Sequence, residues 1–201
     1  MANPEKRIYL ASRSPRRREL LDQIGIAFEV LPMHDAAVDE TPLAGETPVA
    51  YIMRIAQAKA ELGWRQVVSG SLPAGPVLAA DTTVVLGGEI IGKPENAEHA
   101  QQLLRRLAGR THQVLTAIAV AHRQRIETAV SSSAVEFREL DDDEIRRYVA
   151  GGEPLDKAGA YAIQGRAAVF VRAITGSYSG IVGLPLYETA ELLRRFDITP
   201  P

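Results

Sequence analysis

The stretch Ile8-Tyr-Leu-Ala-Ser-Arg-Ser-Pro-Arg-Arg-Arg-Glu-Leu-Leu21 changes within a few residues from an apolar run to a helical pattern. Residues 8–11 are typical of a short buried strand, and Ser14-Pro15 is typical of a helix start. Gly25 predicts the end of that helix. A strand that leads directly into a helix is characteristic of α/β proteins.

The same alternation of strands and helices continues to the end of the chain. We expect further strands at residues 28–31, 77–80, 83–86, 89–91, 112–121, 125–137 and 167–174. We expect further helices at residues 47–62, 97–107, 141–151 and 184–196, with Gly63 as the stop of the first, Asn96 as the cap of the second, and a capping box of Asp141 and Glu144 in the third. The long strands 112–121 and 125–137 add antiparallel pairing. The sequence therefore predicts an α/β fold with a mixed sheet and flanking helices, in a single domain over residues 1–201.

Composition narrows the class of protein further. The chain has 201 residues, of which 46% are hydrophobic, and it has no cysteine and a formal net charge of −2. Disulfide scaffolds and cysteine-ligated metal sites are therefore excluded. The charge gives no general reason to bind nucleic acid or a membrane, and no apolar run approaches the roughly 20 residues that span a bilayer. The opening Met1-Ala-Asn-Pro-Glu-Lys-Arg-Ile-Tyr-Leu-Ala-Ser12 lacks the long apolar run of a signal peptide, so we expect a cytoplasmic protein.

The first turn of the first predicted helix carries positive charge, which the helix dipole disfavours. Cations in the first turn of a helix are each disfavoured by roughly 0.3–1 kcal/mol, yet Arg16, Arg17 and Arg18 are all placed there. An anion such as phosphate would explain them, held by backbone N–H groups, the hydroxyls of Ser12 and Ser14, and one or two guanidiniums. Alternatively, the arginines extend into solvent and pair with nearby carboxylates.

Asp81 follows the apolar strand 77–80, where ligands of α/β sheets bind, so it is a candidate metal ligand or general base. It could instead cap a turn. The acids Asp35, Asp39 and Glu40 lie in an irregular segment from which a carboxylate could help to hold a divalent ion.

Lysine is rare here, with 4 lysines against 19 arginines, which draws attention to each one. Lys93 follows the predicted Gly87-Gly88 hairpin and could fold back toward Asp81. Lys59 lies at the edge of the apolar stripe of its helix, where a lysine can also simply extend to solvent. Lys157 has Asp156 as an adjacent partner. The four histidines show no metal-ligand spacing.

Together, these residues resemble the Maf family of nucleoside triphosphate pyrophosphatases. The motifs that carry the resemblance run in family order: Leu10-Ala-Ser-Arg-Ser-Pro-Arg-Arg-Arg-Glu-Leu-Leu21, Ala80-Asp-Thr82, Gly92-Lys-Pro94, Thr111-His-Gln-Val114, Pro154-Leu-Asp-Lys-Ala-Gly-Ala-Tyr161, Ile163-Gln-Gly165 and Gly183-Leu-Pro185. The resemblance implies two lobes around a central cleft, similar to inosine triphosphate pyrophosphatases. It also implies a nucleoside triphosphate substrate, a divalent cation (Mg²⁺, Mn²⁺ or Co²⁺) and hydrolysis to monophosphate and pyrophosphate. The family commonly forms homodimers, so a homodimer is one expectation.

The resemblance also assigns residues, position by position. Asp81 matches the proton acceptor and, with Glu40, the metal ligands. Ser12, Arg17, Lys59 and Lys93 match phosphate-binding positions. Substrate choice tracks Arg16, Thr82 and Gln164, whose pattern resembles the branch that acts on dTTP and UTP. Gly180 departs from the family pattern, in which many members carry Asn.

Three alternatives concern function. The first is a pyrophosphatase for 7-methyl-GTP or another modified purine, whose branch typically has Trp, Gln and Glu at the three specificity positions. The second is a regulator of cell division that binds nucleotide or nucleic acid without catalysis. The third keeps the pyrophosphatase activity but has a damaged pyrimidine nucleotide as the substrate in place of a standard one.

Overall fold

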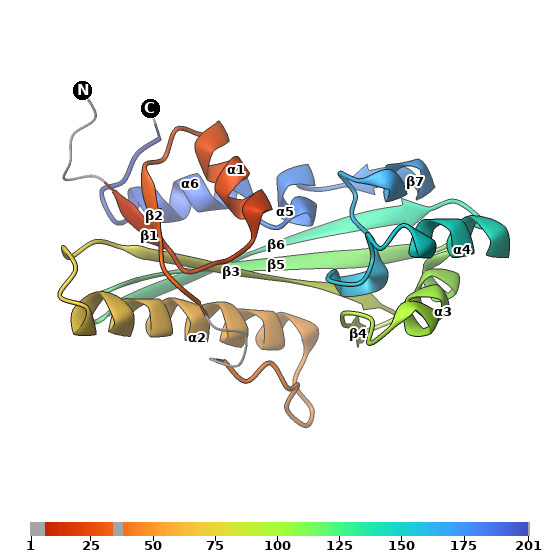
Figure 1. Ribbon diagram of the computed structural model, residues 1–201. Coiled ribbons are helices and arrows are strands. Elements are labelled where there is room, and N and C mark those ends of the chain that lie inside the picture. Colours follow the sequence, from red (N-terminus) through yellow and green to blue (C-terminus); the bar gives the residue numbers. More distant parts are fainter. Residues whose placement is uncertain (1–6, 34–37, 201) are drawn as a thin grey trace. The chain divides into compact units, whose positions relative to one another are not determined.

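The computed structural model describes residues 7–33 and 38–200, which form a mixed sheet of seven strands with helices around it (Figure 1). The strands are β1 (Ile8–Leu10), β2 (Phe28–Val30), β3 (Val77–Leu86), β4 (Glu89–Ile91), β5 (Thr111–His122), β6 (Arg125–Phe137) and β7 (Val171–Thr175). The helices are α1 (Pro15–Gln23), α2 (Pro48–Ser69), α3 (Ala97–Leu107), α4 (Asp142–Ala150), α5 (Tyr178–Val182) and α6 (Leu186–Arg194), with 3-10 turns η2 (Ala158–Ala160) and η3 (Arg166–Phe170). The predicted α/β class and mixed sheet are confirmed. None of these helices combines the length and hydropathy needed to cross a bilayer.

The chain divides into two compact units. The first is formed by the described residues within 1–81, 116–131 and 183–201, and the second by residues 82–115 and 132–182. Strands β3, β5 and β6 each pass from one unit into the other.

The first unit is a three-layer arrangement. Strand β1 pairs in parallel with both β2 and β3, with Ile8 opposite Phe28 and Tyr9 opposite Val77. Parallel neighbours need crossover connections, which α1 and α2 supply. Figure 1 shows α2 along one face of these strands and α1 and α6 on the other. Buried apolar side chains such as Leu21 and Ile52 fill the layers between them.

Helix α2 is longer than predicted, because Gly63 does not stop it. The helix continues through Gly63 to Ser69. A Cβ at this glycine would lie 2.7 Å from Val77 Cγ1 and 3.0 Å from the Ala11 Cβ. Gly63 is thus required for close packing of the helix on β1 and β3, and its signal in the sequence was mistaken for a helix end.

The second unit contains antiparallel pairs, β3 with β4 and β6 with β7. The predicted hairpin is confirmed, with Gly87 and Gly88 both at positive φ. The predicted caps are confirmed too: Asn96 Oδ1 accepts a hydrogen bond from the His99 N–H at 2.9 Å, and Asp141 and Glu144 form a capping box. Helices α3 and α4 contact one another.

The predicted strand 167–174 is partly wrong. Its first half is the 3-10 turn η3, and only β7 is a strand. In η3 the buried side chains Ala167 and Phe170 lie three residues apart, while Ala168 and Val169 between them are exposed. Because positions i and i+3 share a face in a 3-10 turn, this conformation buries both side chains. Helix α5 was not predicted.

A buried histidine lies in the core of the second unit. His112 is 2% exposed, and its ring packs edge-on against Phe137 and Tyr161. Its Nε2 lies 2.8 Å from the Tyr161 hydroxyl, whereas Nδ1 has no hydrogen-bond partner. Burial lowers the pKa of His112 to about 4, from 6.5.

This histidine predicts a pH dependence of stability. Between pH 6.5 and 4 the unfolded chain binds a proton at His112 that the folded chain does not, so the free energy of unfolding falls as pH falls through this range. The loss should approach about 3 kcal/mol near pH 4. Urea unfolding at pH 7.0 and 4.5 measures it. The His112→Gln variant should show a shallower decline, and an equal decline in both proteins would contradict the assignment.

Candidate active site

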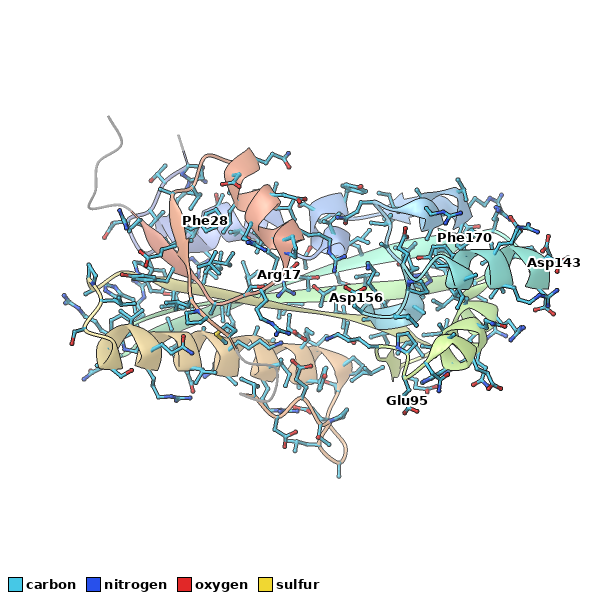
Figure 2. The ribbon with its side chains drawn as sticks, in the orientation of Figure 1. Arg17, Phe28, Glu95, Asp143, Asp156 and Phe170 are labelled. Carbon is cyan, nitrogen blue, oxygen red and sulfur yellow. The ribbon has the colours of Figure 1, made fainter. Side chains whose placement is uncertain are left out.

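The start of α1 is fixed by a buried serine and an arginine. Ser12 is 5% exposed, and its Oγ accepts hydrogen bonds from the Ser14 N–H and from Arg17 Nη1, both at 3.2 Å. Arg17 also donates from Nε to the Gly183 carbonyl at 2.8 Å. Arg17, labelled in Figure 2, is therefore held in place and does not extend freely into solvent.

The carboxylates of Asp81 and Glu40 act electrostatically on Arg17. Burial, and to a smaller extent Arg16, lowers the pKa of Arg17, while the negative charges of Asp81 and Glu40 raise it. The pKa falls overall, so burial outweighs the attraction. The start of α1 and the candidate acids thus belong to one electrostatic environment in the first unit.

Lys59 joins the two acids. Its Nζ lies 2.6 Å from Glu40 Oε1 and 2.6 Å from Asp81 Oδ1. The side chains of Lys59 and Asp81 are 19% and 15% exposed, and that of Glu40 is 42% exposed. The alternative that Lys59 simply extends to solvent is excluded. One ammonium lies between two carboxylates and reduces the repulsion between them.

Asp81 lies inside a strand and not at its end, so its predicted placement is wrong. Strand β3 continues without interruption from Val77 to Leu86. Asp81 and Thr82 are half-buried, and the run of buried residues resumes at Thr83. A carboxylate is tolerated at this position because Lys59 pairs with it.

Tyr51 belongs to this cluster and was missed from the sequence. It is 8% exposed, and its hydroxyl donates to the Glu40 backbone carbonyl at 3.0 Å. Burial and the charges of Asp81 and Glu40 raise its pKa to about 12, so it remains a hydrogen-bond donor at neutral pH. Its spacing from Lys59, eight residues or about two helical turns, was the available signal.

The structure brings together Ser12, Arg17, Glu40, Lys59 and Asp81 in the first unit. A separate set of predicted site residues belongs to the second unit: half-buried Thr82 and exposed Lys93 and Gln164. Their roles stay predictions.

Local contacts and burial account for other residues that the sequence analysis named. Arg16 is half-buried and Arg18 is exposed. Lys157 pairs with Asp156, as predicted. Asp39 Oδ1 accepts from the Thr41 N–H at 2.9 Å, and Asp35 lies outside the described residues.

The predicted metal ligands, Glu40 and Asp81, offer two carboxylates. Within residues 7–33 and 38–200, no group of three or more histidine, aspartate or glutamate side chains is arranged to hold an ion. Glu40 and Asp81 nevertheless direct oxygens to one point, the Lys59 ammonium. Mg²⁺ is commonly bound by one or two carboxylates together with substrate phosphates and water, so this pair fits such an ion.

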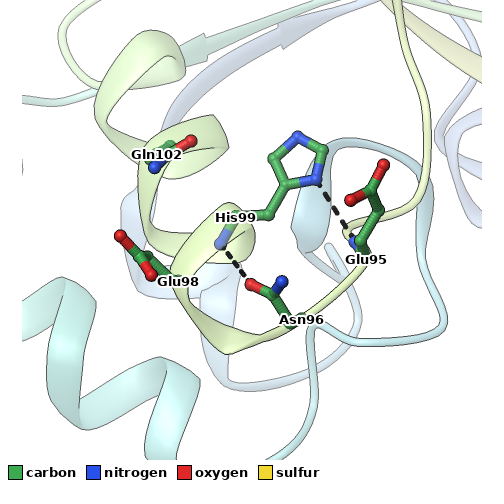
Figure 3. A pocket seen from close by; sticks show the side chains of 5 residues that line it. All are labelled: Glu95, Asn96, Glu98, His99 and Gln102. Carbon is green, nitrogen blue, oxygen red and sulfur yellow. Dashed lines mark hydrogen bonds between the residues drawn. The ribbon is translucent and has the colours of Figure 1, made fainter.

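A surface pocket of about 350 Å³ at the start of α3 is a poorer candidate (Figure 3). It is lined by Glu95, Asn96, Glu98, His99 and Gln102. Local contacts account for two of these residues, since His99 Nδ1 accepts from the Glu95 N–H and Asn96 caps the helix. Its two glutamates and lack of lysine or arginine disfavour a polyphosphate.

Comparisons with known proteins agree on one family. The family described as Maf-like protein matches residues 7–196. A protein of Dechloromonas aromatica named dTTP/UTP pyrophosphatase is 56% identical over 199 residues, covering 96% of this chain and 99% of its own. A protein of Aromatoleum aromaticum with the same name is 58% identical over 198 residues, covering 96% of each chain.

Among solved structures, a HAM1 protein from Coxiella burnetii matches 94% of this chain and 98% of its own at 17% identity, with a TM-score of 0.49. The Ham1 protein of Staphylococcus aureus matches 68% of this chain and 73% of its own at 22% identity, with a TM-score of 0.45.

Proposed function

Because the chain belongs to the family of Maf-like proteins, we propose that it hydrolyses dTTP and UTP to the corresponding monophosphate and pyrophosphate. The observation that carries the proposal is the joint contact of Lys59 with Glu40 and Asp81, close to Arg17, in a chain 56% identical to a dTTP/UTP pyrophosphatase. Such a cluster offers cations that can bind phosphate and a carboxylate that can bind the attacking water.

The polyphosphate is assigned to Ser12, Arg17, Lys59 and Lys93. Arg17 and Lys59 are held by hydrogen bonds before any ligand arrives, which reduces the cost of ordering them on binding. Negative charge grows on the bridging oxygen as the phosphoanhydride bond breaks, and fixed cations stabilise it.

Asp81 is assigned as the group that orients or deprotonates the attacking water at the α-phosphorus. A base must lie within hydrogen-bond reach of the water that it activates. The pairing with Lys59 fixes the carboxylate in one position, and Asp81 is accessible enough, at 15% exposure, for a water molecule to reach it.

The divalent cation of the family, Mg²⁺, Mn²⁺ or Co²⁺, would be held by Glu40 and Asp81 together with substrate phosphate oxygens. When bound, it supplies positive charge that polarises the phosphoryl oxygens. Lys59 supplies the charge that keeps the two carboxylates together when no ion is bound.

Specificity for the pyrimidine base is assigned to Arg16, Thr82 and Gln164. Arg16 and Thr82 are half-buried and Gln164 is exposed. Gly180 is buried in α5, where its N–H donates to Ser177 Oγ at 3.0 Å, so that its backbone is fixed although the side chain of the family's usual Asn is absent.

A substrate panel tests the proposal. Pyrophosphate release is measured for dTTP, UTP, CTP, the purine triphosphates, 7-methyl-GTP and damaged pyrimidine triphosphates, each with Mg²⁺, Mn²⁺ and Co²⁺. We expect dTTP and UTP to give the highest kcat/KM among standard nucleotides. A preference for 7-methyl-GTP would overturn the assignment of Arg16, Thr82 and Gln164. Absence of pyrophosphate from every nucleotide would favour a non-catalytic regulator.

We also place the protein in the cytoplasm, where dTTP and UTP are found. A homodimer, and the absence of nucleic acid and membrane partners, remain predictions. Light scattering during gel filtration measures the oligomeric state.

A further inference from the structure

The segment that carries Glu40 lacks regular secondary structure, yet two side chains of α2 hold its backbone. Tyr51 donates from its hydroxyl to the Glu40 carbonyl at 3.0 Å. Arg54 donates from Nη1 to the Asp39 carbonyl at 3.3 Å and from Nη2 to the Thr41 carbonyl at 3.0 Å. Three consecutive carbonyls are thus bound by residues one helical turn apart.

A carboxylate fixes the arginine in turn. Glu46 accepts from Arg54 Nε at 2.7 Å and from Nη2 at 2.8 Å, so the pair is bidentate. The Glu46 side chain is 9% exposed, and its Oε2 also accepts from the Leu43 N–H at 3.0 Å. Arg54 lowers the pKa of Glu46 to about 2, so the pair stays charged throughout the pH range of an assay.

The same helix carries Lys59, which the Glu40 carboxylate contacts. Glu40 itself is exposed and lies outside any helix or strand, so its own backbone geometry does little to fix it. The contacts from Tyr51 and Arg54 therefore set the distance between the Glu40 carboxylate and the Lys59 ammonium.

We propose that Arg54, supported by Glu46 and Tyr51, is a positioning residue that holds Glu40 against Lys59 for the reaction. The inference rests on the proposed pyrophosphatase function. Neither Arg54 nor Glu46 needs to touch the substrate, since Arg54 acts through the backbone on either side of Glu40. Active-site groups must be held within about 0.5 Å of their productive positions, and contacts behind the reacting groups, such as those of Arg54, hold them there.

A double-mutant cycle separates positioning from general stabilisation. The Arg54→Ala variant should lower kcat for the best nucleotide of the panel about 10- to 100-fold, because a misplacement of about 1 Å costs up to about 10²-fold. In a Glu40→Gln background the same substitution should change kcat by less than about twofold, since Glu40 is then already lost to the reaction. Equal losses in both backgrounds, or a Glu40→Gln variant as active as wild type, would overturn the proposal.

Tyr51→Phe provides a second variant that should fold without difficulty. It removes one hydroxyl and preserves the packing of the ring. We expect a smaller loss of kcat, about 3- to 10-fold, which also disappears in the Glu40→Gln background.

Arg125→Ala is the matched control in the same unit. Arg125 likewise donates from Nε and Nη2 to one carboxylate, Glu127, bonds a backbone carbonyl, that of Arg195, and stacks on a ring, that of Phe196. This variant should keep kcat within about twofold of wild type even if it lowers the melting temperature. A loss of kcat as large as that of Arg54→Ala would show a general effect and overturn the proposal.

Hydrogen exchange gives a readout that does not depend on activity. Amides of residues 38–47 should exchange faster in Arg54→Ala than in wild type, and at the wild-type rate in Arg125→Ala. Unchanged exchange in Arg54→Ala would show that the segment is held by other contacts. If wild-type protein releases no pyrophosphate at all, the proposed function fails, whereas an active wild type with an additive cycle rejects only the role of Arg54.

Discussion

Replacing Asp81 with asparagine is expected to lower kcat by about 10²–10⁴-fold while nucleotide binding stays within about threefold of wild type. Asparagine keeps the size of the side chain and one oxygen for Lys59, but it cannot accept a proton from water. Asp81 Oδ1 lies 2.6 Å from Lys59 Nζ, and the Asp81 side chain is largely buried, at 15% exposure.

Pyrophosphate release gives kcat, and calorimetric titration with nucleotide gives the dissociation constant. Asp142→Asn is the matched control, because Asp142 also contacts a cation at 2.6 Å, Arg105 Nε, but at an exposed position in the second unit. Unchanged turnover in Asp81→Asn would remove Asp81 from the mechanism. A loss of the same size in Asp142→Asn would show that the effect is not specific to the site.

The second large effect is expected for Lys59→Met, which keeps a long apolar stem and removes the ammonium. kcat/KM should fall about 10²–10³-fold, the usual cost of losing one group that stabilises developing charge. Two carboxylates, Glu40 and Asp81, would then face each other without the cation that now lies 2.6 Å from both. Binding of the nucleotide should weaken as well, in contrast to Asp81→Asn.

Steady-state kinetics across a range of nucleotide concentrations separates the effects on kcat and KM. Arg105→Ala serves as the control, since it removes the cation of the exposed pair with Asp142. A Lys59→Met variant with wild-type KM and kcat would mean that the ammonium only balances charge in the folded protein. Its melting temperature, measured alongside, reports the structural share of the effect.

Local signals predicted most of the fold. Helix caps and turns act over a few residues, so the structure confirms the cap at Asn96, the capping box at Asp141 and the Gly87-Gly88 hairpin. The error at Gly63 arose because long-range packing decided the outcome. Gly63 is typical of a helix end, but in the structure it allows α2 to pack closely against Val77, fourteen residues away in the chain.

Most site residues with a local signal in the sequence were predicted, and those that depend on long-range contacts were missed or misplaced. The unfavourable charge at the start of α1 drew attention to Arg16, Arg17 and Arg18, of which the family resemblance then selected Arg17 as a phosphate-binding residue. The rarity of lysine drew attention to Lys59. Asp81 was chosen for a strand end that does not exist, because its pairing with Lys59 lets the strand continue through a carboxylate. Arg54 could not be found, since it acts on the backbone of an irregular segment whose path no local pattern encodes. For Tyr51 the spacing from Lys59 along α2 was the one available signal.

The position of α2 controls two separations in different ways. Lys59 is part of the helix, and Glu40 is tied to it through Tyr51 and Arg54, so both charged groups travel with the helix as one body. Asp81 belongs to β3, four residues beyond the Val77 side chain on which Gly63 packs. Any displacement of α2 from the sheet would therefore lengthen the ammonium's link to Asp81 and leave its link to Glu40 intact. Because Gly63 has no side chain, α2 can lie close to Val77, and this close approach keeps the Lys59 ammonium within reach of the Asp81 carboxylate.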